Sequence, residues 1–191
     1  MLKQNIGIQD YSIMDTGAVH STAQNFLSSI EAGVDPRTGL YSASISLPVG
    51  EGNCLRGPGS VVSLSFSALN NRNTGFGVGW GLSVTSLDLS ANLLQLSSGE
   101  RFRIDPWTQG EECTFPDRKL DSFSLIVENP YRAVISHYSS GIIEILEAPD
   151  GGSRLVTTNL IGTDGSSIFM EWQSFGTDDI RLISIYDDNK T

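Results

Sequence analysis

Two stretches of alternating sequence decide the fold class of this chain: LYSASISLP at residues 40–48 and VVSLSFSA at residues 61–68. In each stretch serines occupy every second position, and Tyr41, Ala43 and Ile45 stand between them in the first. A period of two places the apolar side chains on one face of a strand and the serines on the other. The two stretches therefore predict antiparallel β-sheet with one face in contact with water.

Turn signals surround these strands. VDPRTG at residues 34–39 precedes the first strand, and the glycine-rich loop GFGVGWG at residues 75–81 follows the second. In this order, Val34–Gly39, Ile45–Pro48, Leu64–Phe66 and Phe76–Trp80 resemble the opening segment of RHS-repeat (YD-repeat) proteins and of toxin-complex B-type subunits. Those proteins run from V-D-P-x-T-G through I-x-L-P and L-S-F/Y to F-G-x-G-W. The resemblance covers residues 34–104 clearly and 119–191 loosely.

The resemblance implies a structural protein. In that family the repeats form the wall of a shell that encapsulates a C-terminal toxin used in bacterial competition or insect toxicity. The expected partners are the remainder of the shell and the enclosed toxin domain, and the expected route is synthesis in the cytoplasm without a Sec signal, then export within a larger toxin. The structural residues expected in the turn and the loop are Asp35, Pro36, Gly39, Phe76, Gly77, Gly79 and Trp80.

A self-contained β-sandwich that binds carbohydrate or a cell-surface partner is the rival interpretation. Its sugar platform would come from aromatic residues, but strands are rich in aromatics in any case; they are Trp107, Trp172, Tyr131, Tyr138 and Tyr186. The C-terminal strand Arg181–Tyr186 separates the two interpretations, because a binding module closes its sheet whereas a shell segment leaves an open edge. We expect an open edge that can self-associate, and a natural chain that continues beyond Thr191.

Composition narrows the function further. The 191 residues carry 22 acidic and 12 basic side chains, for a net charge of −10 and a pI near 4.5. Such a chain repels nucleic acid and anionic lipid at long range. No apolar run is long enough for a Sec signal or a membrane span. We therefore expect no nucleic-acid partner and no membrane span.

No catalytic, cofactor or metal motif is present. The glycine-rich loop lacks the G-x-G-x-x-G spacing of a dinucleotide site, and Asp164-Gly165 and Asp187–Asn189 fit turns better than a calcium loop. His137 is expected to pack in a strand or meet solvent, and His20 has no motif around it. We expect no catalytic residue, no cofactor, no metal and no enzymatic activity.

The chain has two cysteines, Cys54 and Cys113, which could form one disulfide or remain two free thiols.

Residues 1–20 show no period and are expected to be a mobile leader or an arm that docks on the domain. Residues 21–104 form the expected opening segment, with one short helix over Thr22–Ala32 that ends at Gly33. An irregular linker at residues 105–118 and hairpins at residues 119–191 complete the expected organisation.

Several further strands are expected after the glycine-rich loop. Leu82–Leu89 is expected to be one strand with a bulge near Ser86, because its apolar phase slips there. Gly-containing turns predict three hairpins, which join Leu93–Leu96 to Phe102–Ile104, Ala133–Tyr138 to Ile142–Leu146, and Leu155–Ile161 to Ile168–Trp172. The fold class expected from the sequence is all-β, either a sandwich or the start of an RHS-type shell.

Overall fold

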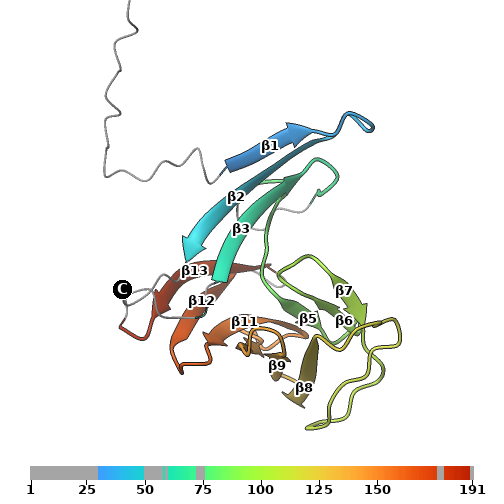
Figure 1. The fold of residues 1–191 in the computed structure, drawn as a ribbon, viewed down its shortest axis with the longest axis vertical. Helices are drawn as coiled ribbons and strands as arrows, with labels where there is room; N and C mark the ends of the chain where they lie inside the picture. The colour runs from blue at the N-terminus through green and yellow to red at the C-terminus, as the bar shows by residue number, and fades with distance from the viewer. Residues whose placement is uncertain (1–29, 50–57, 59, 72–75, 176–178, 190–191) are drawn as a thin grey trace, which may run out of the picture.

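The computed structural model describes residues 30–49, 58, 60–71, 76–175 and 179–189. These residues form strands, turns and loops, and no helix occurs among them, so the expected all-β fold is confirmed. No segment of this described part could cross a membrane as a helix. All strand pairs are antiparallel and fall into two sheets, a smaller one and a larger, curled one (Figure 1).

The smaller sheet is a meander in the order β1-β2-β3-β4. Its strands are β1 (Ile30–Val34), β2 (Tyr41–Val49), β3 (Ser60–Ser67) and β4 (Trp80–Leu82). The alternation quoted above sets the register of β2 against β3, because Ser44 pairs with Ser65 on one face and Ile45 pairs with Leu64 on the other. A shift of β2 by one residue along β3 would place serines beside apolar side chains on both faces, so the alternation disfavours any other register.

The expected helix over Thr22–Ala32 is not confirmed. Ile30, Glu31 and Ala32 belong to β1, where they pair with Ile45, Ser44 and Ala43 of β2, so the prediction is wrong for these three residues. The pairing gives their backbone groups sheet partners that a local helical period cannot foresee. Gly33 continues β1 and pairs with Ser42 instead of ending a helix. Residues 22–29 lie outside the described residues.

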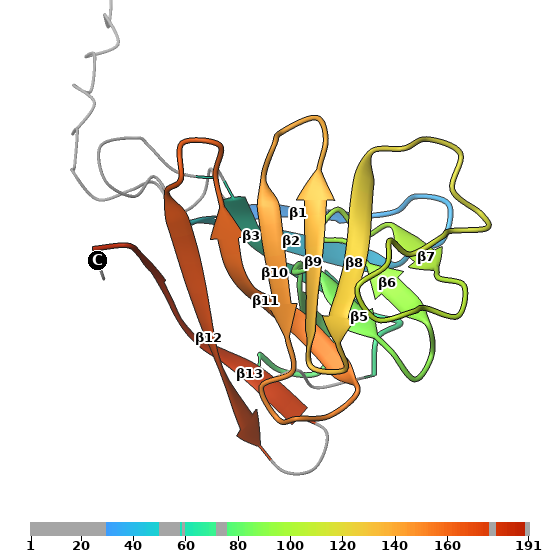
Figure 2. The same ribbon diagram turned by 90° about the horizontal axis from the view of Figure 1, so that it is seen from below.

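The larger sheet has a central path β7-β6-β5-β11-β10-β9-β8, and β12 and β13 branch from β11 (Figure 2). Its strands are β5 (Ser86–Asp88), β6 (Leu93–Gln95), β7 (Arg101–Arg103), β8 (Phe123–Asn129), β9 (Arg132–His137), β10 (Ile143–Glu147), β11 (Arg154–Ile161), β12 (Ser167–Phe175) and β13 (Asp179–Asp187). The three expected hairpins are confirmed as the pairs β6/β7, β9/β10 and β11/β12.

The branch arises on one edge of β11. Its first half, Arg154–Val156, pairs with β5, and its second half, Asn159–Ile161, pairs with β12. Beyond this contact β12 continues away from β11 and pairs with β13 alone. The indole N–H of Trp172 donates to the Thr157 carbonyl at 2.7 Å, and so supplies from a side chain a hydrogen bond that a neighbouring strand would normally supply.

The expected single strand over Leu82–Leu89 is wrong. β4 ends at Leu82 in the smaller sheet and β5 begins at Ser86 in the larger one, so the chain crosses between sheets at residues 83–85. The phase slip near Ser86 marks this crossing instead of a bulge. Because the two strands belong to different sheets, the inward-facing positions of β4 need not be in phase with those of β5.

Two apolar clusters fill the described part of the molecule. The larger lies inside the curled sheet and comprises Leu87, Leu94, Leu96, Ile104, Cys113, Phe123, Leu125, Val127, Ala133, Ile135, Leu146 and Leu155. The smaller comprises Val62, Val84, Leu160, Ile168 and Met170, and it joins the two sheets through Val62 of β3. The domain boundaries expected at residues 20, 104 and 118 stay predictions.

Candidate functional site

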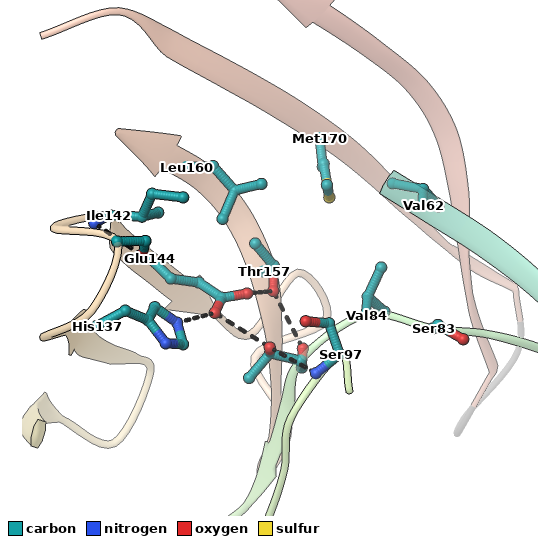
Figure 3. A pocket seen from close by; sticks show the side chains of 12 residues that line it. Val62, Ser83, Val84, Ser97, His137, Ile142, Glu144, Thr157, Leu160 and Met170 are labelled. Atoms are coloured by element: carbon teal, nitrogen blue, oxygen red, sulfur yellow. Dashed lines mark hydrogen bonds and ion pairs between the residues drawn. The ribbon is translucent and has the colours of Figure 1, made fainter. Parts of the chain in front are cut away.

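A cavity of about 210 Å³ lies beside the smaller apolar cluster, which supplies its apolar lining (Figure 3). Side chains from β3, the 83–85 crossing, the β6/β7 turn, the β9/β10 hairpin, β11 and β12 converge on it. They are Val62, Ser83, Val84, Thr85, Ser97, His137, Ser140, Ile142, Glu144, Thr157, Leu160 and Met170. Segments that lie far apart along the chain therefore share one small space.

A buried carboxylate dominates the cavity. Glu144 is 4% exposed, and a charge in such a place needs hydrogen-bond donors. The Thr157 hydroxyl donates to Oε1 at 2.5 Å, the Thr85 hydroxyl donates to Oε2 at 3.1 Å, and His137 Nε2 lies 3.1 Å from Oε2. We call these four residues the Glu144 cluster. Each carboxylate oxygen thus has a partner from a different part of the chain.

The local fold explains this arrangement. Glu144 takes an inward position of β10, in the same phase as Ile142 and Leu146, and pairs with Ile135 of β9. His137 stands two residues along β9 on that inward face. The turn between them closes with hydrogen bonds from His137 N to Ile142 O and from Gly141 N to His137 O.

A β-bulge brings the threonine of β11 to the carboxylate. The register shifts between Ile145 and Leu146, which pair with Asn159 and Thr157, so no residue of β10 stands opposite Thr158 in the register. This extra residue reverses the phase of β11, and Leu160 and Thr157 both face the interior. Thr85 is fixed beside Thr157, because the Thr157 N–H donates to the Thr85 carbonyl at 3.2 Å.

The order of groups in the Glu144 cluster matters for its chemistry. In a nucleophilic triad the histidine stands between the hydroxyl and the carboxylate and removes the proton of the hydroxyl. Here the carboxylate stands in the centre, and both threonine hydroxyls and the imidazole bind to it. This arrangement holds a buried charge and joins β9, β10 and β11 to the crossing at Thr85. It does not activate either hydroxyl as a nucleophile.

Sequence reasoning missed most of this cluster. It placed His137 in a strand but found no carboxylate partner for it, and it singled out neither Glu144 nor the two threonines. One signal was available, since Glu144 interrupts the apolar alternation of Ile142 and Leu146 at an inward position. Thr85 is 59 residues from Glu144 along the chain, and no local pattern connects them.

None of the seven expected structural residues lines the cavity. Asp35, Pro36 and Gly39 lie in the turn between β1 and β2, where Gly39 has φ +67 and its N–H donates to the Asp35 carbonyl at 2.7 Å. Asp35 Oδ1 accepts the Arg37 N–H at 2.8 Å. This backbone hydrogen bond, followed by one from the Thr38 side chain, lowers the pKa of Asp35.

The loop residues Phe76, Gly77, Gly79 and Trp80 lie beside β3 instead. The Trp80 ring contacts the Phe66 ring at a centroid distance of 5.5 Å, and both Trp80 and Gly77 are half-buried. Gly79 has φ +91, and a Cβ there would lie 2.4 Å from Phe66 Cε2. Phe76 is 40% exposed. The roles of these residues as anchors of the fold stay predictions.

Cys113 is a free thiol buried in the larger apolar cluster. Desolvation is the main reason that its pKa is raised. Cys54, the other cysteine, lies outside the described residues. Within the described part of the chain, no three His, Cys, Asp or Glu side chains are grouped as metal ligands would be.

Comparison with known proteins was made at the levels of sequence and of structure. No protein-family model matches the sequence, and no curated protein matches it. Solved structures do match. A crystal structure of TcdB2-TccC3-TEV has a TM-score of 0.57 at 13% identity over 87% of this chain, and the Photorhabdus luminescens Tc holotoxin pore has a TM-score of 0.56 at 13% identity over 83%.

The N-terminal domain of the effector protein SpvB from Salmonella typhimurium strain LT2 has a TM-score of 0.52 at 14% identity over 77% of this chain. At such identities the likeness concerns the fold, and the resemblance expected from residues 34–80 is confirmed at that level. This chain spans 10% of the length of the Tc toxin chains and 64% of the SpvB chain. It has the fold of a segment found in Tc toxin components.

Proposed function

We propose that this chain is a structural segment of the wall of a toxin-complex assembly and helps to enclose a C-terminal toxin domain. Its partners are then the neighbouring wall strands and the enclosed domain, and it reaches its target as part of an exported toxin. In this role the chain supplies a wall surface and an open strand edge, and it catalyses no reaction.

The observation that carries this proposal is the open edge at β13. Among the described residues β13 pairs with β12 on one side and with no strand on the other. Ile183 on this strand is 54% exposed. An unpaired strand edge presents N–H and C=O groups that the next strand can bind. A wall extends by this kind of addition, whereas a self-contained carbohydrate-binding sandwich closes its sheets.

The shared fold and the curled sheet support the same proposal. A curled antiparallel sheet with its larger apolar cluster on the inside is a suitable unit of a hollow container. The order of the groups in the Glu144 cluster also agrees with a structural role, because the cluster connects strands. No observation of the described residues favours the carbohydrate-binding alternative over the wall.

The test is limited proteolysis of the complete toxin protein that contains this segment. If the segment closes a wall, the C-terminal domain resists protease in the intact assembly. Substitution of Ile183→Pro in β13 removes a strand N–H and should expose the domain to cleavage. The matched control is Leu120→Pro, at an exposed loop position of the described part. Equal protection in both variants and the parent would contradict the proposal.

A further inference from the structure

The cavity beside the Glu144 cluster has two chemically different sides. Figure 3 shows Val62, Leu160 and Met170 along one side, and Glu144 and Thr157 with their hydrogen bonds along the other. The three apolar side chains are all buried, so the first side is a hydrocarbon surface. A ligand that fills such a cavity needs an apolar body and a polar group at one end.

The charge of Glu144 is not balanced by a permanent cation. Within the described part of the chain, no Lys or Arg forms an ion pair with it, and its ionisable partner His137 carries a charge only when the ring is protonated. The other two partners are the neutral hydroxyls of Thr85 and Thr157. Burial of a charge is costly when only neutral groups surround it. A cation that entered the cavity would therefore be stabilised beside Glu144.

The carboxylate also retains one acceptor position. An ionised carboxylate accepts about four hydrogen bonds, and the described residues supply three, from Thr85 and His137 at Oε2 and from Thr157 at Oε1. The Thr85 oxygen accepts the Ser97 N–H at 3.1 Å, which leaves its hydroxyl proton for Glu144. Because Glu144 lines the cavity, the remaining position on Oε1 can accept a proton from a ligand there.

Two serines mark the entrance to the cavity. Ser97 in the β6/β7 turn and Ser140 in the β9/β10 turn both line it, and both are exposed to solvent. The volume of about 210 Å³ is larger than the roughly 150 Å³ of an apolar cavity that holds benzene. A ligand with an apolar body of this size can therefore enter from solvent and reach the carboxylate.

We propose that this cavity binds a primary alkylammonium group. The ammonium donates to Oε1 of Glu144, and its other protons are within the chemistry of the Ser83 and Ser97 hydroxyls, which accept hydrogen bonds. The alkyl chain lies against the buried hydrocarbon surface of Leu160 and Met170. The site is independent of the proposed place in a wall, because it uses no part of the β13 edge.

Other classes of ligand fit less well. An anion would meet the carboxylate at short range, and, apart from His137, no ionisable group other than Glu144 lines the cavity among the described residues. An uncharged alkyl group would fill the apolar side but leave the charge of Glu144 unbalanced. A primary ammonium occurs both in small free amines and in the lysine side chains of polypeptides, and the binding chemistry is the same for the two sources.

The test is titration of the full chain with n-butylammonium, followed through the methyl signals of Val84, Leu160 and Met170 in nuclear magnetic resonance spectra. We expect saturable shifts, with a dissociation constant on the order of millimolar for so small a ligand. 1-Butanol has the same chain length without the charge and should bind at least about tenfold more weakly, because hydrogen bonds between charged groups are the stronger ones. Equal affinities, or no saturable shift with butylammonium, would overturn the proposal.

Two variants on β10 provide the matched comparison. Glu144→Gln keeps the shape of the side chain but removes its charge, and should weaken butylammonium binding at least about tenfold. Glu147→Gln removes a half-exposed carboxylate that pairs with Arg132 at 2.9 Å outside the cavity, and should bind as the parent does. Parent-like binding by Glu144→Gln would overturn the proposal. If Glu144→Gln does not fold, the comparison of the two ligands in the parent still decides.

Nα-acetyl-lysine N-methylamide separates the two sources of the ammonium, because its side chain has the length of n-butylammonium. If the site accepts a lysine of a polypeptide, the derivative binds at least as tightly as butylammonium, with its amides at the entrance by Ser97 and Ser140. If the site accepts a free amine, the entrance excludes the amides and the derivative binds more weakly. Binding of the derivative that is insensitive to Glu144→Gln would overturn the assignment of the ammonium to Glu144.

Discussion

Gly79 is the residue at which the packing most clearly depends on one side chain. Its positive φ and the 2.4 Å approach of a Cβ to Phe66 both require the absence of a side chain. Gly79→Ala should lower the free energy of unfolding by about 1–3 kcal/mol, because the backbone is strained and the Phe66 ring must move. Denaturant unfolding measures this. Gly81→Ala is the control, since nothing lies within 4 Å of its Cβ, and an equal loss in both variants would contradict the account.

Thr157 gives a second prediction at this scale. Thr157→Val keeps the shape of the side chain but removes the hydroxyl that donates to buried Glu144. We expect a loss of about 1–3 kcal/mol in the free energy of unfolding, because the carboxylate then lacks one donor. Thr108→Val, at an exposed position, should change little. A Thr157→Val chain as stable as the parent would show that the Thr157 hydroxyl contributes nothing to stability.

Asp88 gives a prediction about pH. Oδ1 accepts hydrogen bonds from the Ser90 hydroxyl at 2.6 Å and from the Ala91 N–H at 3.0 Å, and the Ser90 hydroxyl is the main cause of its lowered pKa. A lowered pKa contributes stability that is present above the unfolded value, near 3.8, and lost as the pH falls through the folded value.

Asp88→Asn should therefore be slightly less stable than the parent at pH 7, by less than about 1 kcal/mol at this solvated turn. The difference should shrink below about pH 4. Thermal melts of both proteins across this range provide the measurement, and Asp117→Asn at an exposed position is the control. A difference that grows toward acid pH would contradict the sign of the shift.

At the scale of elements, period-two alternation predicted the sheets and the hairpins, because each strand carries its own apolar phase. It could not predict which sheet a strand joins. Leu82 and Ser86 stand four residues apart in one alternating stretch, yet they lie in different sheets. The strand at Ile30–Val34 was missed for a related reason, since its partner is supplied by the hairpin with β2.

The site shows the same limit. The inward position of Glu144 could be inferred from its alternation, but its approach to Thr157 depends on a bulge that adds Thr158 to β11. Its approach to Thr85 depends on the crossing between sheets. Neither feature has a local signature in the sequence, so the cluster needed the structure.

The branch point of the larger sheet gives a prediction for an element. Trp172→Phe keeps an aromatic ring but removes the N–H that donates to the Thr157 carbonyl. We expect a loss of about 1–2 kcal/mol in the free energy of unfolding and faster amide exchange in β12 than in β9. Trp107→Phe is the control, because Trp107 packs on the larger cluster through its ring. Unchanged exchange in β12 would contradict the role of the indole.

At the scale of the whole molecule, the described part of the chain combines an interior that is already closed with surfaces that are open. The Glu144 cluster joins β9, β10 and β11 to the crossing at Thr85, so the body can fold as a unit. The β13 edge presents backbone groups that need a partner. A wall segment requires this combination, since it must hold its own shape before its neighbours are added.

Amide hydrogen exchange of β13, measured with sedimentation across a range of protein concentration, tests the central claim most directly. The account predicts that alternate amides of residues 182–186 exchange quickly in the monomer, because no strand among the described residues pairs with β13 on the open edge. They should become protected when copies associate or when the next strand is supplied. Uniformly slow exchange of these amides in a dilute monomer would contradict the open edge and the proposed place of this chain in a wall.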